Sequence, residues 1–284
     1  MVKSWMFWVV GLVMSSAVAS SAISADAQSS RTAALSPSTS TASATTSTSN
    51  SSAPDLSGLA EISTDADFAV EVLNLDTGET ASYGGGSFDT ASIVKVDILA
   101  ALLFQAQHEG RGLTASEQSQ AAAMIERSDN TAATTLFNAV GGKSGLEEFN
   151  DMIGLEDTVV GSNGNWGLTQ TTSADQIRLL KVVFGSDSVL TSESQAYMKS
   201  LMSNVIDSQD FGVSAADDDG DAALKVGYLQ RSATGLWDVT SIGEIEAGGE
   251  TFLVAVLSED NSSYEAGVAL VDEVAQAAVS SVVE

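Results

Sequence analysis

The sequence predicts an α+β fold in which both ends of the folded part of the chain build one antiparallel sheet. Alternating apolar side chains mark residues 67–83 and 223–258, and a long stretch between them has helical spacing of its apolar residues. No internal repeat interrupts this order. Strands at both ends of a helical stretch are typical of α+β domains. We therefore expect a sheet part, residues 57–90 and 210–284, with an all-helical subdomain, residues 91–209, inserted into it.

The first residues have the order of an export signal. Lys3 precedes an apolar run over residues 5–14, and small residues follow that run. This order is typical of a secretory signal peptide, and the run is shorter than the roughly 20 residues of a membrane-spanning helix. We expect residues 1–27 to be a signal peptide, cut after Ala19 or Ala27, with an uncleaved anchor as the alternative. The predicted location is secreted or extracytoplasmic, which includes association with the cell wall.

Residues 28–56 are dominated by serine, threonine and alanine and have no periodic apolar face. Such a composition cannot bury enough apolar surface to offset the entropy of ordering. This segment is predicted to be a disordered linker. Both prolines of the chain, Pro37 and Pro54, fall in it, and the folded domain is expected over residues 57–284.

The elements of that domain follow in order along the chain. Two strands are predicted at 67–75 and 79–83, joined by the hairpin signal Asp76-Thr77-Gly78. A helix over 92–108 is apolar almost all round, which indicates a buried helix. Further helices are predicted at 115–126, 131–140, 144–153, 173–184 and 191–205, the fourth of these with a capping box of Ser173 and Gln176. Three strands at 223–230, 236–246 and 251–258 and a last helix at 264–282 complete the domain.

Composition excludes several kinds of chemistry. The chain has no cysteine and one histidine, so it has no disulfide, no cysteine nucleophile and no histidine-rich metal site. That histidine, His108, falls at the end of the buried helix, where a helix-end role is expected rather than catalysis. The net charge is −27, which opposes binding to nucleic acid or to anionic polymers. The acidic run at 217–221 lacks the spacing of a calcium loop, and we expect a solvated turn there.

Ser92 and Lys95 are the candidate catalytic pair. Lys95 interrupts the most apolar helix of the protein, where burial lowers the pKa of a lysine and makes it a usable base. Ser92 lies three residues earlier on the same face, at the first turn of the helix. Such a pair gives an activated nucleophile without histidine. The alternative is that Ser92 only caps the helix while the Lys95 ammonium reaches out to solvent.

Two further motifs favour the catalytic interpretation. Ser128-Asp129-Asn130 stands between two predicted helices, and Lys225-Val226-Gly227 opens the first strand of the C-terminal block. Each alone has an ordinary structural explanation. Together, in this order and on these elements, they match the S-x-x-K, S-D-N and K-T-G motifs of class A β-lactamases and penicillin-binding proteins.

The sequence resembles the class A β-lactamase-related serine hydrolases of the penicillin-recognising β-lactamase and DD-peptidase superfamily from about Asp65 to Val283. The resemblance is carried by FDTASIVKVDILAALL, MIERSDNTAATTLF, WGLTQTTSADQIRLL and the segment over residues 223–257. It implies a five-stranded antiparallel sheet flanked by helices, with the active site between the sheet and the helical subdomain. It also implies four catalytic residues and four substrate-binding ones: catalytic Ser92, Lys95, Ser128 and Lys225, and substrate-binding Asn130, Val226, Gly227 and Tyr228.

In detail, the resemblance implies that Ser92 is acylated, Lys95 takes its proton and Ser128 passes a proton to the leaving nitrogen. Backbone N–H groups of Ser92 and Tyr228 would form the oxyanion hole. Two positions depart from the family pattern. Val226 stands where a hydroxyl binds the substrate's carboxylate, and residues 161–170 lack the Ω-loop glutamate that activates the deacylating water.

The predicted function is therefore that of a secreted serine hydrolase. It would form an acyl-enzyme at Ser92 with a β-lactam, peptide or ester, and the missing glutamate would make deacylation slow. The alternative is a non-catalytic module that binds cell-wall peptides in the same cleft. The expected partner is a small-molecule or peptide substrate, with cell-wall material as one source. We expect a monomer without cofactor, metal, bound nucleic acid or a stable membrane span after signal cleavage.

Overall fold

The computed structural model describes residues 55–283, and these contain one five-stranded antiparallel sheet between two helical layers. The predicted signal peptide and nearly all of the predicted linker lie outside the described residues. The strands are β1 (Asp67–Asn74), β2 (Thr80–Tyr83), β5 (Ala223–Gln230), β6 (Trp237–Ala247) and β7 (Glu250–Asn261), in the order β2-β1-β7-β6-β5. The predicted α+β class and the five-stranded antiparallel sheet are confirmed.

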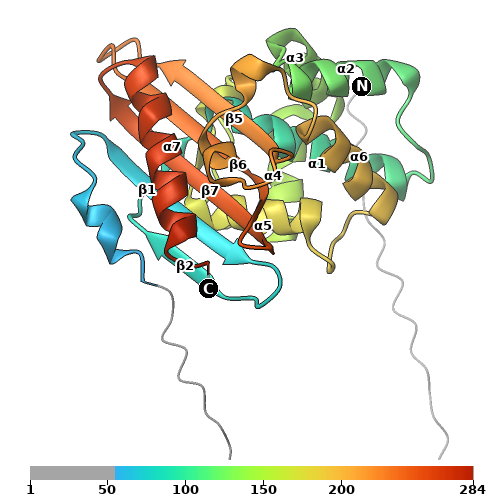
Figure 1. The fold of residues 1–284 in the computed structure, drawn as a ribbon. Coiled ribbons are helices and arrows are strands. Elements are labelled where there is room, and N and C mark those ends of the chain that lie inside the picture. The colour runs from blue at the N-terminus through green and yellow to red at the C-terminus, as the bar shows by residue number, and fades with distance from the viewer. Residues whose placement is uncertain (1–54, 284) are drawn as a thin grey trace, which may run out of the picture. The chain divides into compact units, whose positions relative to one another are not determined.

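The two ends of the domain meet in the middle of the sheet. Strand β1 pairs with β7 over its whole length, with Val70 opposite Val256, and Figure 1 shows the first and last strands side by side. Every residue of β7 from Phe252 to Ser258 is buried. Its alternate side chains enter two different cores, because successive side chains of a strand point to opposite faces. This explains why the segment reads as a continuous apolar run.

One core lies under the C-terminal helix. Helix α7 (Tyr264–Ser280) packs on one face of the sheet with the short 3-10 turns η1 (Ser57–Glu61) and η5 (Gly212–Ala216), as Figure 1 shows for α7. The Ser263 hydroxyl caps α7 by accepting from the Ala266 N–H at 3.1 Å. Val226 and Val239 belong to this core.

The other core belongs to the helical layer. Its helices are α1 (Val94–His108), α2 (Ala115–Glu126), α3 (Asn130–Ala139), α4 (Gly142–Ile153), α5 (Ser173–Phe184) and α6 (Ser192–Met202). Helix α1 is buried along most of its length, as its all-round apolar sequence predicts. A small second sheet of β3 (Phe88–Asp89) and β4 (Gln170–Thr171) ties the segment before α1 to the segment before α5.

Two local predictions are wrong. The helix predicted from residue 92 begins at Val94, because residues 91–93 form the 3-10 turn η2 with the Ile93 N–H bonded to the Thr90 carbonyl. The N-cap of α5 is Thr172, whose hydroxyl accepts from the Asp175 N–H, and not Ser173. In both cases two adjacent residues are equally suited to begin the helix, and the hydrogen bonds that form decide which of them does.

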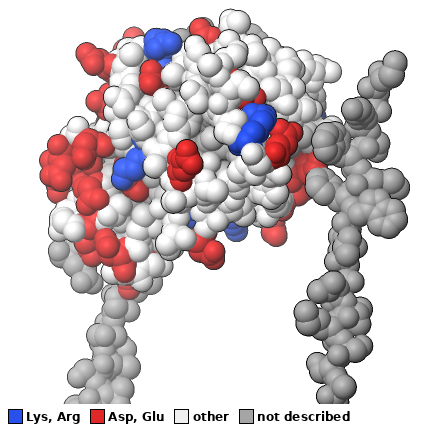
Figure 2. All heavy atoms as spheres, turned by 90° about the vertical axis from the view of Figure 1, so that its right-hand side faces the viewer, with Lys and Arg blue, Asp and Glu red and all other residues white. Residues whose placement is uncertain are grey.

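Charge is spread over the surface of the domain. Figure 2 shows one face with several groups of Asp and Glu and a few isolated Lys or Arg among them. Over residues 55–283, no helix combines the length and apolarity needed to cross a bilayer.

Candidate active site

Ser92 lies in η2, where the chain turns from β3 into α1. The residue before it, Ala91, has φ 46°, a left-handed conformation that residues with a Cβ rarely adopt. The N-cap of α1 is Ile93, and no side chain caps the helix there. The alternative in which Ser92 serves as the helix cap is therefore not what the structure shows. Its hydroxyl points to Lys95 instead.

The Lys95 amino group is buried among four oxygen atoms. Its Nζ lies 2.9 Å from the Ser92 Oγ, 2.7 Å from the Ser128 carbonyl oxygen, 2.9 Å from the Ser128 Oγ and 2.8 Å from the Asn130 Oδ1. The residue is 0% exposed, so the side chain does not reach out to solvent. The three motif residues Ser92, Ser128 and Asn130 thus converge on one nitrogen.

This geometry can also be formed by a neutral amine. A neutral lysine has two N–H groups and one lone pair, and the Ser128 carbonyl and the Asn130 Oδ1 can only accept. The lone pair is then available to accept a proton from the hydroxyl of Ser92 or Ser128. Burial lowers the pKa of Lys95 to about 8, and the nearby Asp129 carboxylate opposes the shift. A useful fraction of Lys95 is consequently unprotonated near neutral pH.

The turn between α2 and α3 places the carbonyl and hydroxyl oxygens of Ser128 next to Lys95. Asp129 is the N-cap of α3, and its Oδ1 accepts from the Ala132 N–H at 2.7 Å. The Asp129 N–H bonds to the Ala123 carbonyl, and Ser128 is held at φ 56°. Through its side chain and its N–H, Asp129 therefore ties this strained turn to both α3 and α2. It leaves the Ser128 carbonyl and hydroxyl facing the lysine.

Strand β5 closes the site from the sheet side. A Cβ on Gly227 would lie 2.6 Å from the Ser92 nitrogen and 2.6 Å from the Thr90 carbonyl oxygen, so only glycine lets the strand approach η2 this closely. The Val226 side chain is 0% exposed and packs in the core under α7. Tyr228, the next residue, is 41% exposed at the edge of the sheet. Whether its N–H and that of Ser92 act as an oxyanion hole stays a prediction.

Lys225 is also buried, with 0% of its surface exposed. Its Nζ donates to the Gln209 Oε1 at 3.2 Å and to the Val226 carbonyl at 2.9 Å. Burial, and secondarily the positive charge of Lys95, hold its pKa well below the usual value. Within residues 55–283, Lys225 has no hydrogen bond to Ser128. Gln209, on the 3-10 turn before η5, belongs to no recognisable motif, so no pattern in the sequence pointed to it.

In the region that corresponds to the Ω-loop, an aromatic ring lies next to Lys95. Trp166 lies on the turn η3 (Trp166–Leu168), and the Lys95 Nζ is 5.1 Å from the ring centroid. The indole Nε1 donates to the Thr134 Oγ1 at 3.2 Å, which fixes the ring. Gln170, in the same region, forms hydrogen bonds with Asp89 and Ser87. Among residues 55–283, no carboxylate forms a hydrogen bond or ion pair with Lys95.

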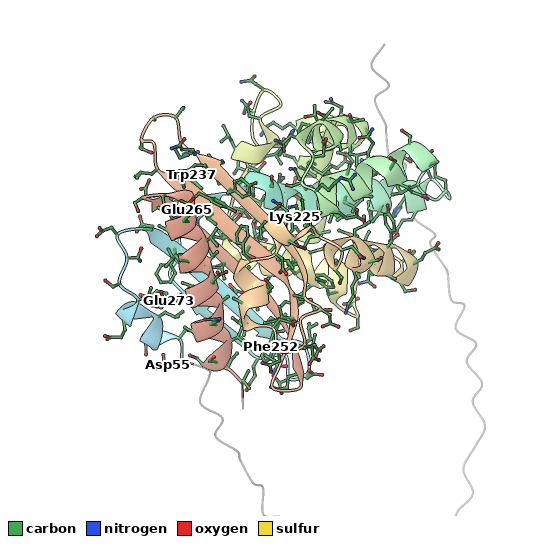
Figure 3. The ribbon with its side chains drawn as sticks, turned by 45° about the horizontal axis from the view of Figure 1, so that its top comes forward. Asp55, Lys225, Trp237, Phe252, Glu265 and Glu273 are labelled. Carbon is green, nitrogen blue, oxygen red and sulfur yellow. The ribbon has the colours of Figure 1, made fainter. Side chains whose placement is uncertain are left out.

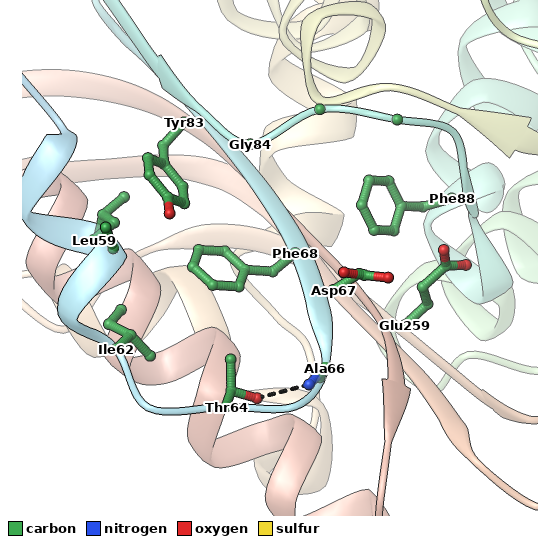
Figure 4. Close-up of a pocket in the computed structure, with 13 residues that line it drawn as sticks. Leu59, Ile62, Thr64, Ala66, Asp67, Phe68, Tyr83, Gly84, Phe88 and Glu259 are labelled. Carbon is green, nitrogen blue, oxygen red and sulfur yellow. Dashed lines mark hydrogen bonds between the residues drawn. The ribbon is translucent and has the colours of Figure 1, made fainter.

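Other candidate features lie apart from this cluster. His108 is exposed at the far end of α1, where its Nδ1 is 2.9 Å from the Phe104 carbonyl oxygen. A cavity of about 520 Å³ lies between η1 and the β1–β2 hairpin, and Figure 4 shows Phe68, Tyr83 and Phe88 around it. None of the residues that line it is a predicted site residue. Within the described part of the chain, no group of acidic and histidine side chains could hold a metal ion.

The fold and the clustered motif residues define a serine hydrolase of β-lactamase type. Residues 111–282 match the model of the family described as "Beta-lactamase enzyme family". The chain therefore belongs to this family. Among curated proteins, no sequence matches the chain.

Solved structures show the same fold at low sequence identity. A class A β-lactamase of Bacteroides cellulosilyticus DSM 14838 is 18% identical with a TM-score of 0.66, covering 76% of this chain and 91% of its own. The TLA-1 extended-spectrum β-lactamase is 19% identical with a TM-score of 0.72, covering 80% and 98%. PBP-A is 20% identical with a TM-score of 0.67, covering 78% and 92%, and a mutant of it is described as an acyl-enzyme complex with penicillin G.

Proposed function

We propose that this chain is a serine hydrolase that forms an acyl-enzyme at Ser92, with Lys95 as the general base, on a β-lactam, peptide or ester. The observation that carries the proposal is the buried Lys95 Nζ, 2.9 Å from the Ser92 Oγ, where burial favours its neutral form. A lysine in this setting can remove the hydroxyl proton at a modest pH.

The reaction divides into two steps. The Ser92 oxygen attacks the substrate carbonyl carbon while its proton passes to Lys95. The bond to the leaving nitrogen or oxygen then breaks, and that atom receives a proton through the Ser128 hydroxyl, which is 2.9 Å from the Lys95 Nζ. The product of this step is an ester on Ser92. Water must hydrolyse the ester to release the acid and restore the hydroxyl.

Slow deacylation is the second part of the proposal. It is supported by the Trp166 ring, which occupies the Ω-loop side of Lys95 and cannot accept a proton from water. The asparagines Asn163 and Asn165 are exposed and cannot act as bases either. The acylated state is therefore expected to accumulate.

Intact-protein mass spectrometry with penicillin G and with an activated ester tests both parts. We expect a stable mass increase that disappears in Ser92→Ala and persists in Ser82→Ala, a matched control on β2 at the opposite edge of the sheet. Labelling that survives Ser92→Ala would remove Ser92 from the mechanism. Rapid turnover without an adduct would contradict slow deacylation. Stabilisation by wall peptides, with no acylation by any donor, would favour the non-catalytic binding module.

We also propose that the chain is exported. The support is the order of charged, apolar and small residues in the first 27 positions. N-terminal sequencing of the protein recovered outside the cells tests this, and a mature start after Ala19 or Ala27 is expected. Recovery of the full-length chain inside the cells would contradict it.

A further inference from the structure

Arg231 joins two buried carboxylates, one on the segment that leads to Ser92 and one on the main sheet. The guanidinium, just after β5, pairs with Asp89 on β3 and lies 3.6 Å from the Asp238 carboxylate on β6. Both aspartates are buried, whereas the Arg231 side chain is 39% exposed. Among the described residues, Arg231 is the only basic residue that forms an ion pair with either carboxylate. We call these three residues the charge clamp.

The charge clamp lies on the face of the sheet that meets Ser92. Successive side chains of a strand point to opposite faces, so Gly227 and Leu229 share one face of β5. A Cβ on Gly227 would meet the Ser92 nitrogen, which marks this face as the side of the site. Asp238 is opposite Leu229 in the register of β5 and β6 and belongs to the same face. Tyr228 points to the other face, where α7 packs.

The first contact between β5 and the segment before Ser92 is at Gly227. A Cβ there would lie only 2.6 Å from the Ser92 nitrogen. The Thr240 hydroxyl of β6 lies between the two segments, 3.2 Å from the Thr90 carbonyl oxygen and 3.3 Å from that of Gly227. The Ser92 amide and the strand that carries the Tyr228 amide are thus held close together at this point.

The charge clamp is the second contact, at the end of β5 that turns into β6. Figure 3 labels Lys225 toward the start of β5 and Trp237 at the opposite end, where β6 begins. Arg231 is in the turn at this end, and Asp89 is three residues before Ser92. A single contact would let the strand pivot about it. Two contacts at separate points fix both the distance and the direction of β5 relative to residues 89–92.

The segment between Asp89 and Ser92 needs such support. Ala91 has φ 46°, and a strained backbone of this kind persists only where the surrounding structure holds it. On its other side Asp89 is held by β4, because Gln170 donates a hydrogen bond to its carboxylate. Loss of Arg231 would leave two buried carboxylates without a basic partner, which is strongly destabilising. The segment and the strand would then separate at the end that the clamp closes.

We propose that Arg231, through its ion pairs with Asp89 and Asp238, is a positioning residue for the backbone N–H groups of Ser92 and Tyr228. This inference rests on the acylation of Ser92 proposed above. During acylation a negative charge develops on the oxygen of the substrate carbonyl, and two N–H donors stabilise it only if both point at its position. Arg231 acts through the backbone of β5 and of the segment before Ser92, and no proton transfer is assigned to it.

The test compares an ester with the thiono ester in which sulfur replaces the carbonyl oxygen. Sulfur is larger and a weaker hydrogen-bond acceptor, so two well-placed N–H donors favour the oxygen ester. Acylation of Ser92 by 4-nitrophenyl acetate and by its thiono analogue is followed by intact-protein mass spectrometry, and each rate is divided by that of the same donor with hydroxide in buffer. Burial raises the pKa of Asp238 to about 6, so its carboxylate stays charged in an assay at pH 8.

The readout is the ratio of the two corrected rates, oxygen ester over thiono ester. A loss of folded protein lowers both rates equally and leaves this ratio unchanged, whereas misplaced N–H donors slow the oxygen ester more. In Arg231→Gln the ratio is expected to fall about tenfold, a part of the hundredfold or more that removal of one such donor costs. Arg231→Lys keeps the charge and should retain a larger ratio than Arg231→Gln.

Two further variants separate positioning from stability. Asp89→Asn should lower the ratio as Arg231→Gln does, and the double variant should lower it no further, because both changes break the same contact. The double variant also avoids an unpaired Asp89 carboxylate, so it provides the measurement if Arg231→Gln does not fold. Arg178→Gln is the matched control, since Arg178 pairs with the buried Asp175 on α5, and it should keep the wild-type ratio.

The outcomes separate the two proposals. An unchanged ratio in both Arg231→Gln and Asp89→Asn, whether the two rates stay the same or fall together, would overturn the positioning role while leaving Ser92 acylation in place. An equal fall of the ratio in Arg178→Gln would also overturn it, because the effect would not be specific to the charge clamp. No acylation of the wild-type protein by either donor would overturn the acylation proposal and this inference with it.

Discussion

The depressed pKa of Lys95 predicts a specific dependence of the acylation rate on pH. Only neutral Lys95 can take the Ser92 proton, and its pKa of about 8 results first from burial and is opposed by Asp129. With that pKa, the neutral fraction is about one tenth at pH 7 and about nine tenths at pH 9, by the ordinary titration relation. The acylation rate should therefore rise about tenfold over this interval and level off above it.

A lysine with an ordinary pKa predicts a different curve. At its usual value of 10.5, the neutral fraction would still rise about tenfold per pH unit through pH 9, a hundredfold between pH 7 and 9. The assay is the rate of appearance of the Ser92 adduct with an activated ester between pH 6 and pH 10, corrected for hydrolysis of the ester in buffer. A bend near pH 8 is the expected result.

A control variant and the pH dependence of stability support this interpretation. Lys95→Arg cannot deprotonate in this range and should give a slow, flat profile. Because the folded-state pKa of Lys95 is lowered, its contribution to stability rises as pH rises from about 8 to 10.5, so the fold is not expected to weaken over the range through this group. A rate that climbs with unit slope past pH 10, or that does not change with pH, would refute the role of Lys95 as the base.

Three substitutions test other parts of the structure. Trp166→Glu places a carboxylate against Lys95 and should speed decay of the Ser92 adduct by at least about tenfold relative to wild type. Trp166→Gln should not speed this decay. Equal decay in both variants would contradict the explanation that deacylation is slow because a carboxylate is missing here. Burial raises the pKa of Asp97 to about 8, so wild type should lose about 1.4 kcal/mol of unfolding free energy per pH unit between pH 5 and 7 relative to Asp97→Asn. Urea unfolding at the two pH values measures this, and a constant difference between the proteins would argue against a buried protonated Asp97. Gly227→Ala puts a methyl group 2.6 Å from the Ser92 nitrogen and should cut acylation by about a hundredfold or more, while Gly112→Ala, with open space around it, should have no effect on the labelling rate.

The regular elements were predictable because their apolar patterns are strong. The ranges 115–126, 173–184 and 223–230 match α2, α5 and β5 residue for residue. The other predicted helices and strands are displaced by a few residues at their ends, where caps and 3-10 turns decide the boundary. Strands β3 and β4 were missed, since two residues carry no readable alternation and their pairing depends on segments about eighty residues apart.

The site was predictable where motif spacing defines it and not where tertiary packing does. The convergence of Ser92, Ser128 and Asn130 on Lys95 follows the motifs. The partner of Lys225, Gln209, comes from a short turn without any pattern. The placement of Trp166 over Lys95 depends on how residues 161–170 fold, which the sequence did not indicate beyond the lack of a carboxylate.

The pairing of β1 with β7 has a consequence for how the protein is made. Within the domain, strand β1 leaves the ribosome early, yet its partner across Val70 and Val256 is among the last segments of the domain to be synthesised. Until then the β1–β2 hairpin has an unpaired edge, which is a template for association with other chains. Contacts of such high sequence separation also slow folding, because a long loop must close before they form. The central strand pair can therefore form only after nearly the whole domain has been translated, and nascent chains that stop before β7 are expected to need protection from aggregation.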